Sequence, residues 1–181
     1  MARIVLITGG SRSGKSCHAL ARGASLPGSR TFVATCPRVD AELQERIQRH
    51  QEARAAGGWK TVEEERDVAG AIRGASHASV VLVDCLTLWV NNLMYEAEQD
   101  GWDLAESDIA SACGELVAAC RDHPGTVLLV TNEVGFSIIP ENPAARRFRD
   151  LVGRANQCIA DAADEVTLVC CGLPVRLKDP E

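Results

Sequence analysis

Aromatic residues are scarce in this chain, and basic residues are in the minority. Only 4% of the 181 residues are aromatic, so Ala, Val, Leu and Ile must form most of the core. The 25 acidic residues outnumber the 19 Lys and Arg residues, which gives a formal net charge of -6 at pH 7. Broad binding to nucleic acid needs a basic surface. The composition therefore argues against a nucleic-acid-binding protein.

The sequence also lacks long apolar runs and paired cysteines. No stretch approaches the roughly 20 apolar residues of a membrane-spanning helix, and the apolar segment at residues 3–7 is too short for a signal peptide. None of the eight cysteines forms a C-x-x-C pair, and no Cys/His cluster has zinc-site spacing. We therefore expect a cytoplasmic protein without a membrane span. We also expect its cysteines, including Cys170 and Cys171 in an apolar run, to be buried and reduced.

Apolar runs of strand length alternate with helical stretches along the chain. This alternation is typical of an α/β fold, a mostly parallel sheet with helices on both faces, and the length fits one domain, residues 1–181. The predicted strands are residues 4–8, 31–34, 80–84, 127–131 and 165–171, with an edge strand at 173–177. The predicted helices are residues 15–24, 40–56, 105–121 and 143–163, and residues 55–60 and 132–142 are predicted loops at strand ends.

A glycine-rich segment follows the first predicted strand and precedes a predicted helix. It has the G-x-x-x-x-G-K-S pattern of a phosphate-binding loop (P-loop), in the structural context that this motif requires. Backbone N–H groups of such a loop bind phosphate oxygens, its lysine contacts the β- and γ-phosphates of ATP or GTP, and its serine coordinates Mg²⁺. The loop predicted here comprises Gly9, Gly10, Ser11, Arg12, Ser13, Gly14, Lys15 and Ser16.

Asp84 ends a later apolar run, as the Walker-B aspartate of P-loop proteins does. We predict that it holds Mg²⁺ together with Ser16, through a water molecule, or contacts the nucleotide ribose. The N-K-x-D motif with which switch GTPases bind guanine is absent, because residues 131–135 start similarly but lack its Lys and Asp. The residues alone therefore indicate a P-loop kinase or nucleotidyltransferase and leave its substrate open.

Further segments resemble one family over nearly the whole chain. They are RIQRHQEAR at residues 46–54, WKTVE at 59–63, DCLTLW at 84–89, TNEVG at 131–135, PEN at 140–142, RRFRD at 146–150, GRANQ at 153–157 and GLP at 172–174. In this order and spacing, and with the P-loop, they are similar to the bifunctional adenosylcobinamide kinase/adenosylcobinamide-phosphate guanylyltransferases of cobalamin biosynthesis.

The resemblance implies a P-loop fold of the RecA type, a homotrimer and two successive reactions. Adenosylcobinamide would be phosphorylated on its aminopropanol hydroxyl with ATP or GTP. GMP from GTP would then be transferred to adenosylcobinamide phosphate through a guanylylated histidine, which gives adenosyl-GDP-cobinamide. The resemblance makes His50 and Lys15 the catalytic residues. The other nucleotide contacts that it implies are Ala34, Thr35, Cys36, Gln51, Glu52, Ala53, Arg54, Glu63 and Asp84.

His50 also has suitable chemistry. On a helix, Arg46 and Arg54 share a face with His50. Flanking positive charge favours the neutral, nucleophilic imidazole and stabilises charge on an attacked phosphate. Imidazole attack on phosphorus forms a covalent phosphoramidate. From the residues alone, a surface histidine beside exposed arginines is the alternative.

Several alternatives stay open at this stage. The chain fits a P-loop small-molecule kinase without nucleotidyl transfer, or a non-catalytic nucleotide-sensing module. Asp84 and Glu133 are both candidates for the general base of the kinase step. The loop at 132–142 is a candidate part of the corrinoid pocket by position. The arginines that open the last long helix bind phosphate or a neighbouring subunit, or form a solvated face; they are Arg146, Arg147, Arg149 and Arg154.

Overall fold

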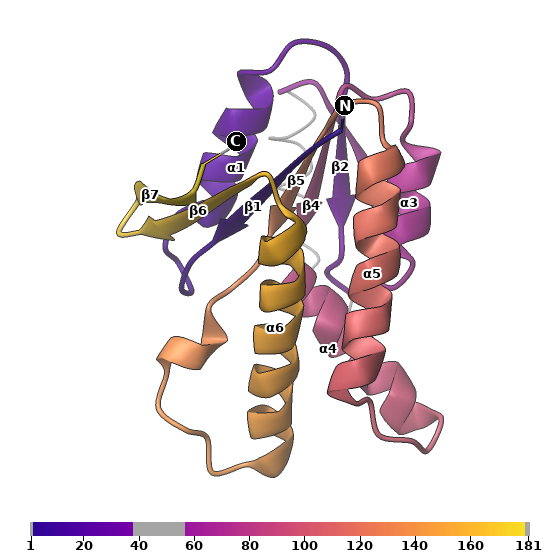
Figure 1. Cartoon of the computed structure of the whole chain (residues 1–181), viewed down its shortest axis with the longest axis vertical. Coiled ribbons are helices and arrows are strands. Elements are labelled where there is room, and N and C mark those ends of the chain that lie inside the picture. Colours follow the sequence, from indigo (N-terminus) through magenta and orange to yellow (C-terminus); the bar gives the residue numbers. More distant parts are fainter. Residues whose placement is uncertain (1, 38–56, 180–181) are drawn as a thin grey trace.

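The computed structural model describes residues 2–37 and 57–179, which form a seven-stranded sheet covered by helices (Figure 1). The strands lie in the order β3-β2-β4-β5-β1-β6-β7, and neighbouring strands are parallel except for the antiparallel pair β6 and β7. The mostly parallel sheet and its edge strand are thus confirmed. The strands are β1 Arg3–Thr8, β2 Arg30–Ala34, β3 Trp59–Glu63, β4 Val80–Asp84, β5 Thr126–Val130, β6 Glu165–Cys170 and β7 Leu173–Lys178.

Three of the four predicted helices are confirmed to within one residue at each end. The fourth, at residues 40–56, lies outside the described residues. Sequence reasoning did not predict α3, which is short, or α4, which begins directly after β4 without a loop between them. The helices are α1 Lys15–Ala24, α3 Val68–Gly74, α4 Leu86–Gln99, α5 Glu106–Asp122 and α6 Pro143–Ala162, with a 3₁₀ turn η1 at Val134–Phe136.

Strand β1 is buried on both faces of the sheet. Ile4 and Leu6 belong to the core cluster shared with α3, α4, α5 and α6, while Val5 and Ile7 pack in a second cluster with Ala19 of α1. Figure 1 shows α5 and α6 on one face and α1 on the other. Because successive side chains of a strand point to opposite faces, a continuous apolar run fits a strand covered on both sides.

The predicted loop at residues 55–60 is wrong for its last two residues, which begin β3. Gly57 and Gly58 lie in the turn before that strand. Trp59, its first residue, is buried and packs edge-on against Phe32 of β2, with ring centroids 6.4 Å apart. The same indole fills the space beside Gly23 of α1, where an added Cβ would lie 2.6 Å from the ring. Burial of this aromatic ring therefore outweighs the loop signal of the two glycines.

The prediction that the cysteines are buried is correct for only some of them. Cys85, Cys113 and Cys120 are buried, whereas Cys17, Cys170 and Cys171 are exposed. The run that contains the last two ends at the sheet edge. Val169 packs in the core, whereas Cys170 is the exposed last residue of β6 and Cys171 begins the exposed turn to β7. An apolar run in the sequence thus does not show which of its residues a neighbouring element covers.

The carboxyl ends of the parallel strands are aligned along one edge of the sheet. Ala34 of β2 pairs with Glu63 on one side and with Asp84 on the other. Asp84 in turn pairs with Val130 of β5, which pairs with Ile7 just before the P-loop. Ligands of open α/β sheets bind beyond this edge, so the register brings the P-loop and Asp84 to the same side of the molecule.

Candidate nucleotide site

The P-loop turns from β1 into α1 around Gly14. This residue is the N-cap of α1 and has a φ of 95°, in the left-handed region that favours glycine. Lys15 folds back over the loop, where its Nζ donates to the Gly10 carbonyl at 3.0 Å. The Ser13 N–H donates to the same carbonyl at 3.2 Å. The loop thus joins a tight turn, a helix N-terminus and a lysine, the combination that binds phosphate.

Gly9 is required by the close approach of β6. A Cβ added to Gly9 would lie 2.4 Å from the Val169 carbonyl oxygen and 2.7 Å from Ser13 Oγ. The Val169 carbonyl is part of a buried strand and cannot move aside as a flexible side chain would. The first glycine of the motif therefore allows β6 to pack directly on the loop.

The turn between β6 and β7 also braces the P-loop, a role that sequence reasoning missed. Its central residues, Cys171 and Gly172, have φ values of 53° and 80°, as a two-residue type I′ hairpin requires. The Gly172 N–H donates to the Ser13 carbonyl at 2.8 Å, and a Cβ added to Gly14 would lie 3.3 Å from the Gly172 Cα. The signal in the sequence was a Cys-Gly pair between two strand-forming runs.

Lys15 and Asp84 interact electrostatically. Lys15 is only 8% exposed, and burial lowers the pKa of its ammonium group, with Cys85 and Asp84 acting in the opposite direction. Burial, assisted by Asp84, raises the pKa of the Cys85 thiol to about 11, so this thiol is neutral at physiological pH. The carboxylate at the end of β4 therefore raises the pKa of the P-loop lysine, against the larger effect of burial.

Thr35, which follows β2, has its polar groups engaged within the protein. Its Oγ1 donates to the Cys85 carbonyl at 2.8 Å and accepts from the Cys85 N–H at 2.7 Å. Its N–H donates to the Asp84 carbonyl at 3.3 Å, and its carbonyl accepts from the Asn92 amide at 2.9 Å. We propose that Thr35 serves the nucleotide site by holding the chain around Asp84.

A polar network links α6 to the residues after β5, and sequence reasoning missed most of it. Asn156 of α6 accepts from Thr131 Oγ1 at 2.7 Å, and its amide donates to the Asn132 carbonyl at 2.9 Å and to Glu133 Oε1 at 3.1 Å. The same Glu133 oxygen accepts from Thr8 Oγ1 at 2.8 Å. A polar residue on the buried face of α6 was the available signal.

Glu133 joins this network to the P-loop itself, because its N–H donates to the Gly9 carbonyl at 3.2 Å. We therefore propose that Glu133 is a positioning residue and not the general base. Glu133→Gln keeps an acceptor oxygen, so we expect it to retain most kinase activity. Asn156→Ala leaves buried partners unsatisfied and should lower the free energy of unfolding by about 1–3 kcal/mol.

Chemical denaturation and steady-state kinase kinetics measure these two effects. Glu115→Gln, at an exposed position of α5, is the matched control for the charge change. A collapse of kcat in Glu133→Gln at unchanged stability would show that the carboxylate acts as a base.

Two of the four arginines of α6 are engaged in holding neighbouring segments. Arg146 donates to the Pro140 carbonyl at 2.9 Å and to the Glu141 carbonyl. Arg147 donates to the Leu104 carbonyl at 2.8 Å and pairs with the Asp103 carboxylate. These guanidinium groups hold in place the segment that precedes α6 and the loop that precedes α5. This structural use is one that the sequence did not indicate.

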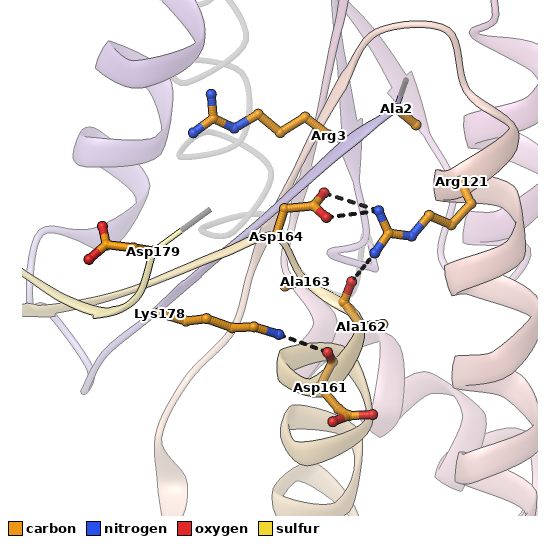
Figure 2. Close-up of a pocket in the computed structure, with 9 residues that line it drawn as sticks. All are labelled: Ala2, Arg3, Arg121, Asp161, Ala162, Ala163, Asp164, Lys178 and Asp179. Atoms are coloured by element: carbon orange, nitrogen blue, oxygen red, sulfur yellow. Dashed lines mark hydrogen bonds and ion pairs between the residues drawn. The ribbon is translucent and has the colours of Figure 1, made fainter. Parts of the chain in front are cut away.

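A hollow of about 460 Å³ lies at the amino end of β1, away from the P-loop (Figure 2). Its lining groups bind one another: Arg121 forms an ion pair with Asp164 through two hydrogen bonds, and Lys178 donates to the Asp161 backbone carbonyl at 2.8 Å. Burial alone would raise the pKa of Asp164, but hydrogen bonds from the Ile4 N–H and from Arg121 lower it below its ordinary value. These contacts tie α5 and α6 to the sheet.

The described residues of the predicted site lie along the carboxyl edge of the sheet. Glu63 ends β3, four strands from β1 in the sheet, which corresponds to about 19 Å at the usual strand spacing. Its contact with the end of a nucleotide remote from the P-loop stays a prediction. Ala34 and Cys36 flank Thr35 between these two ends. His50, Gln51, Glu52, Ala53 and Arg54 lie outside the described residues.

The predicted ligands Ser16 and Asp84 suit a magnesium site of the kind found in P-loop proteins. Ser16 lies in the first turn of α1, and Asp84 stands at the same sheet edge. Among residues 2–37 and 57–179 no three Cys, His, Asp or Glu side chains are grouped to hold a metal. A P-loop magnesium site needs no such group, because phosphate oxygens and water complete its coordination. None of the helices in this part of the chain is long and apolar enough to cross a membrane.

Comparison with known proteins identifies relatives over nearly the full length of the chain. The family model "Cobinamide kinase / cobinamide phosphate guanyltransferase" (CobU) matches residues 5–177. The "bifunctional adenosylcobalamin biosynthesis protein CobU" of Salmonella typhimurium is 42% identical and that of Escherichia coli 40%, each across 97% of this chain and 99% of the relative. The corresponding CobP of Pseudomonas aeruginosa is 36% identical across 96% of both chains.

The fold has a solved counterpart as well. A KaiC-like protein of Pyrococcus horikoshii superposes on 92% of this chain and 70% of its own, with a TM-score of 0.51 and 18% identity. This likeness concerns the fold alone, and with the P-loop and the sheet order it confirms the predicted P-loop fold of the RecA type. The sequence matches go further: this chain belongs to the cobinamide kinase / cobinamide phosphate guanyltransferase family.

Proposed function

We propose that this protein phosphorylates adenosylcobinamide with ATP or GTP and then transfers GMP from GTP to adenosylcobinamide phosphate. The observation that carries the proposal is membership of this family over residues 5–177, together with an intact P-loop whose Lys15 interacts with Asp84 at the end of β4. We further propose that it works as a homotrimer in the cytoplasm.

In the kinase step, the P-loop holds the triphosphate while the substrate hydroxyl attacks the γ-phosphorus. Lys15 and the loop N–H groups stabilise the charge that develops on the phosphoryl oxygens. A bound Mg²⁺, held by Ser16 and Asp84, would neutralise further phosphate charge. Tight packing of β6 and its turn on the loop keeps these donors in place before the nucleotide binds.

In the transfer step, we propose that the His50 imidazole attacks the α-phosphorus of GTP and that pyrophosphate leaves. The product is a guanylyl-histidine phosphoramidate. A phosphate oxygen of adenosylcobinamide phosphate then attacks the same phosphorus, which releases the imidazole and forms the diphosphate bond. This proposal rests on the match of residues 46–54 to the family pattern.

Separate assays of the two half-reactions test the function. With γ-labelled ATP we expect label on the corrinoid, and with α-labelled GTP and adenosylcobinamide phosphate we expect labelled adenosyl-GDP-cobinamide. Transfer of γ-label alone would support a small-molecule kinase without nucleotidyl transfer. Nucleotide binding with neither product would support a nucleotide-sensing module.

The segment after β5 supports the proposed place of the corrinoid. Glu133 is anchored at the P-loop, and three large apolar side chains follow it on the surface: Phe136 is 81% exposed, Ile138 92% and Ile139 67%. Contiguous exposed apolar residues mark binding surfaces. We propose that they contact the macrocycle of the corrinoid substrate.

We therefore expect Phe136→Ser to raise the KM for adenosylcobinamide and to leave nucleotide affinity unchanged. Tyr95→Ser, which removes a 62% exposed ring on α4, is the control. Light scattering of both variants tests whether these side chains instead form a contact between subunits. A loss of oligomeric mass without a change in corrinoid KM would assign these side chains to a subunit contact.

A further inference from the structure

Two thiols lie side by side on the turn that braces the P-loop. Cys170 ends β6 and Cys171 begins the turn, both side chains are exposed, and their Sγ atoms are 3.9 Å apart. Neither thiol takes part in the proposed reactions. The hairpin therefore carries a pair of adjacent nucleophilic groups that the proposed function does not use.

The separation of the sulfur atoms suits chelation. Two thiolates bound to one ion at about 2.3 Å, with a near-tetrahedral angle between them, are about 3.8 Å apart. A disulfide would instead require about 2.05 Å between the sulfur atoms and a Cα separation above about 4.4 Å, whereas consecutive Cα atoms are about 3.8 Å apart. A bridging ion thus needs little movement, while a disulfide would distort the turn.

The backbone that carries the two thiols is fixed by contacts with the P-loop. Cys171 has a φ of 53°, in the left-handed region, and the following Gly172 N–H is fixed to the Ser13 carbonyl at 2.8 Å. The β6 backbone before Cys170 packs on Gly9. A site on this turn is therefore partly organised before an ion arrives, which lowers the entropy lost on binding.

We propose that Cys170 and Cys171 form a two-thiolate site for a soft divalent cation of the Zn²⁺ or Cd²⁺ type. Binding replaces the two thiol protons, which are released to solvent, and water fills the remaining coordination positions. Thiolates prefer such cations to Mg²⁺, which takes oxygen ligands. The site is thus chemically separate from the Mg²⁺ position at Ser16 and Asp84, and it does not depend on the proposed function.

Cadmium titration of the reduced full-length protein, without nucleotide, tests the proposal. We expect one tight equivalent of Cd²⁺, seen as thiolate-to-cadmium charge-transfer absorption in the ultraviolet, that excess Mg²⁺ does not displace. Cys170→Ser and Cys171→Asn should each weaken it by about tenfold or more, which corresponds to about 1.4 kcal/mol. Asn tolerates the left-handed conformation, so Cys171→Asn keeps the turn, and a thermal melt checks this.

Cys17→Ser, which removes another exposed thiol, is the matched control and should bind Cd²⁺ like the wild type. Tight binding that survives in the Cys170→Ser, Cys171→Asn double variant would overturn the proposal. So would an unchanged affinity in either single variant, or a wild type that takes up no Cd²⁺. The reduced protein could instead lose the mass of two hydrogens in air and bind no Cd²⁺. That result would show that the two cysteines form a disulfide, and it would also overturn the proposal.

Discussion

Lys15→Met is expected to lower kcat/KM of the kinase step by about 10²–10³-fold, the usual effect of losing one donor to a developing charge. The Lys15 ammonium group is buried in the P-loop and interacts with Asp84. Methionine has a similar length, so the loss concerns charge more than packing. Because one P-loop serves both proposed reactions, guanylyl transfer should fall as well. Steady-state kinetics of both half-reactions measure the effect.

The pH dependence of the same lysine adds a second test. Lys15 must be protonated to neutralise phosphate, and burial lowers its pKa from the ordinary value of 10.5. In the free enzyme, kcat/KM should therefore decline at high pH, with a midpoint below 10.5. Lys60→Met, at an exposed position of β3, should leave both the rate and this profile unchanged. If Lys15→Met keeps wild-type kcat/KM in both half-reactions, the P-loop assignment is wrong.

His50→Ala is expected to abolish guanylyl transfer, with a loss of at least about 10³-fold, because the covalent route loses its nucleophile. Incubation of the wild type with α-labelled GTP should give a protein-bound label that is labile in acid and stable in alkali, as a phosphoramidate is. The variant should carry no such label. Its kinase step should persist, because the γ-phosphoryl group passes directly from the nucleotide to the corrinoid hydroxyl.

His77→Ala, which removes an exposed histidine before β4, is the control for this experiment. It should form the adduct at the wild-type rate. Adduct formation that continues in His50→Ala would place the nucleophile elsewhere. Equal loss of both half-reactions would show a general role in nucleotide binding or folding, and would leave the family assignment intact.

The P-loop could be predicted from the sequence because it is local. Eight consecutive residues between an apolar run and a helix determine its turn, and the chemistry of Lys15 follows from its place in that pattern. The strands that bury both faces could be predicted for the same reason, because continuous apolar runs report burial directly. Asp84 could be placed because it ends one such run.

The supports of the site could not be predicted in this way, because they join residues far apart in the chain. Glu133 acts on the P-loop through Thr8 and Gly9, about 125 residues earlier, and Asn156 reaches it from α6. The sequence around Glu133 and Asn156 does not indicate which residues they contact. The same holds for β3, where burial of Trp59 against Phe32 outweighs the loop signal of the glycines before it.

By itself, then, the sequence determined the fold class, the phosphate-binding loop and the family, which depend on contiguous patterns and on their order. Only the tertiary structure decided how the loop is held. The β6–β7 turn reaches Ser13 and Gly14 from more than 150 residues away, and the same packing exposes the thiols of Cys170 and Cys171. The physical reason is that strand pairing at the sheet edge, and not local propensity, determines which side of that turn is covered.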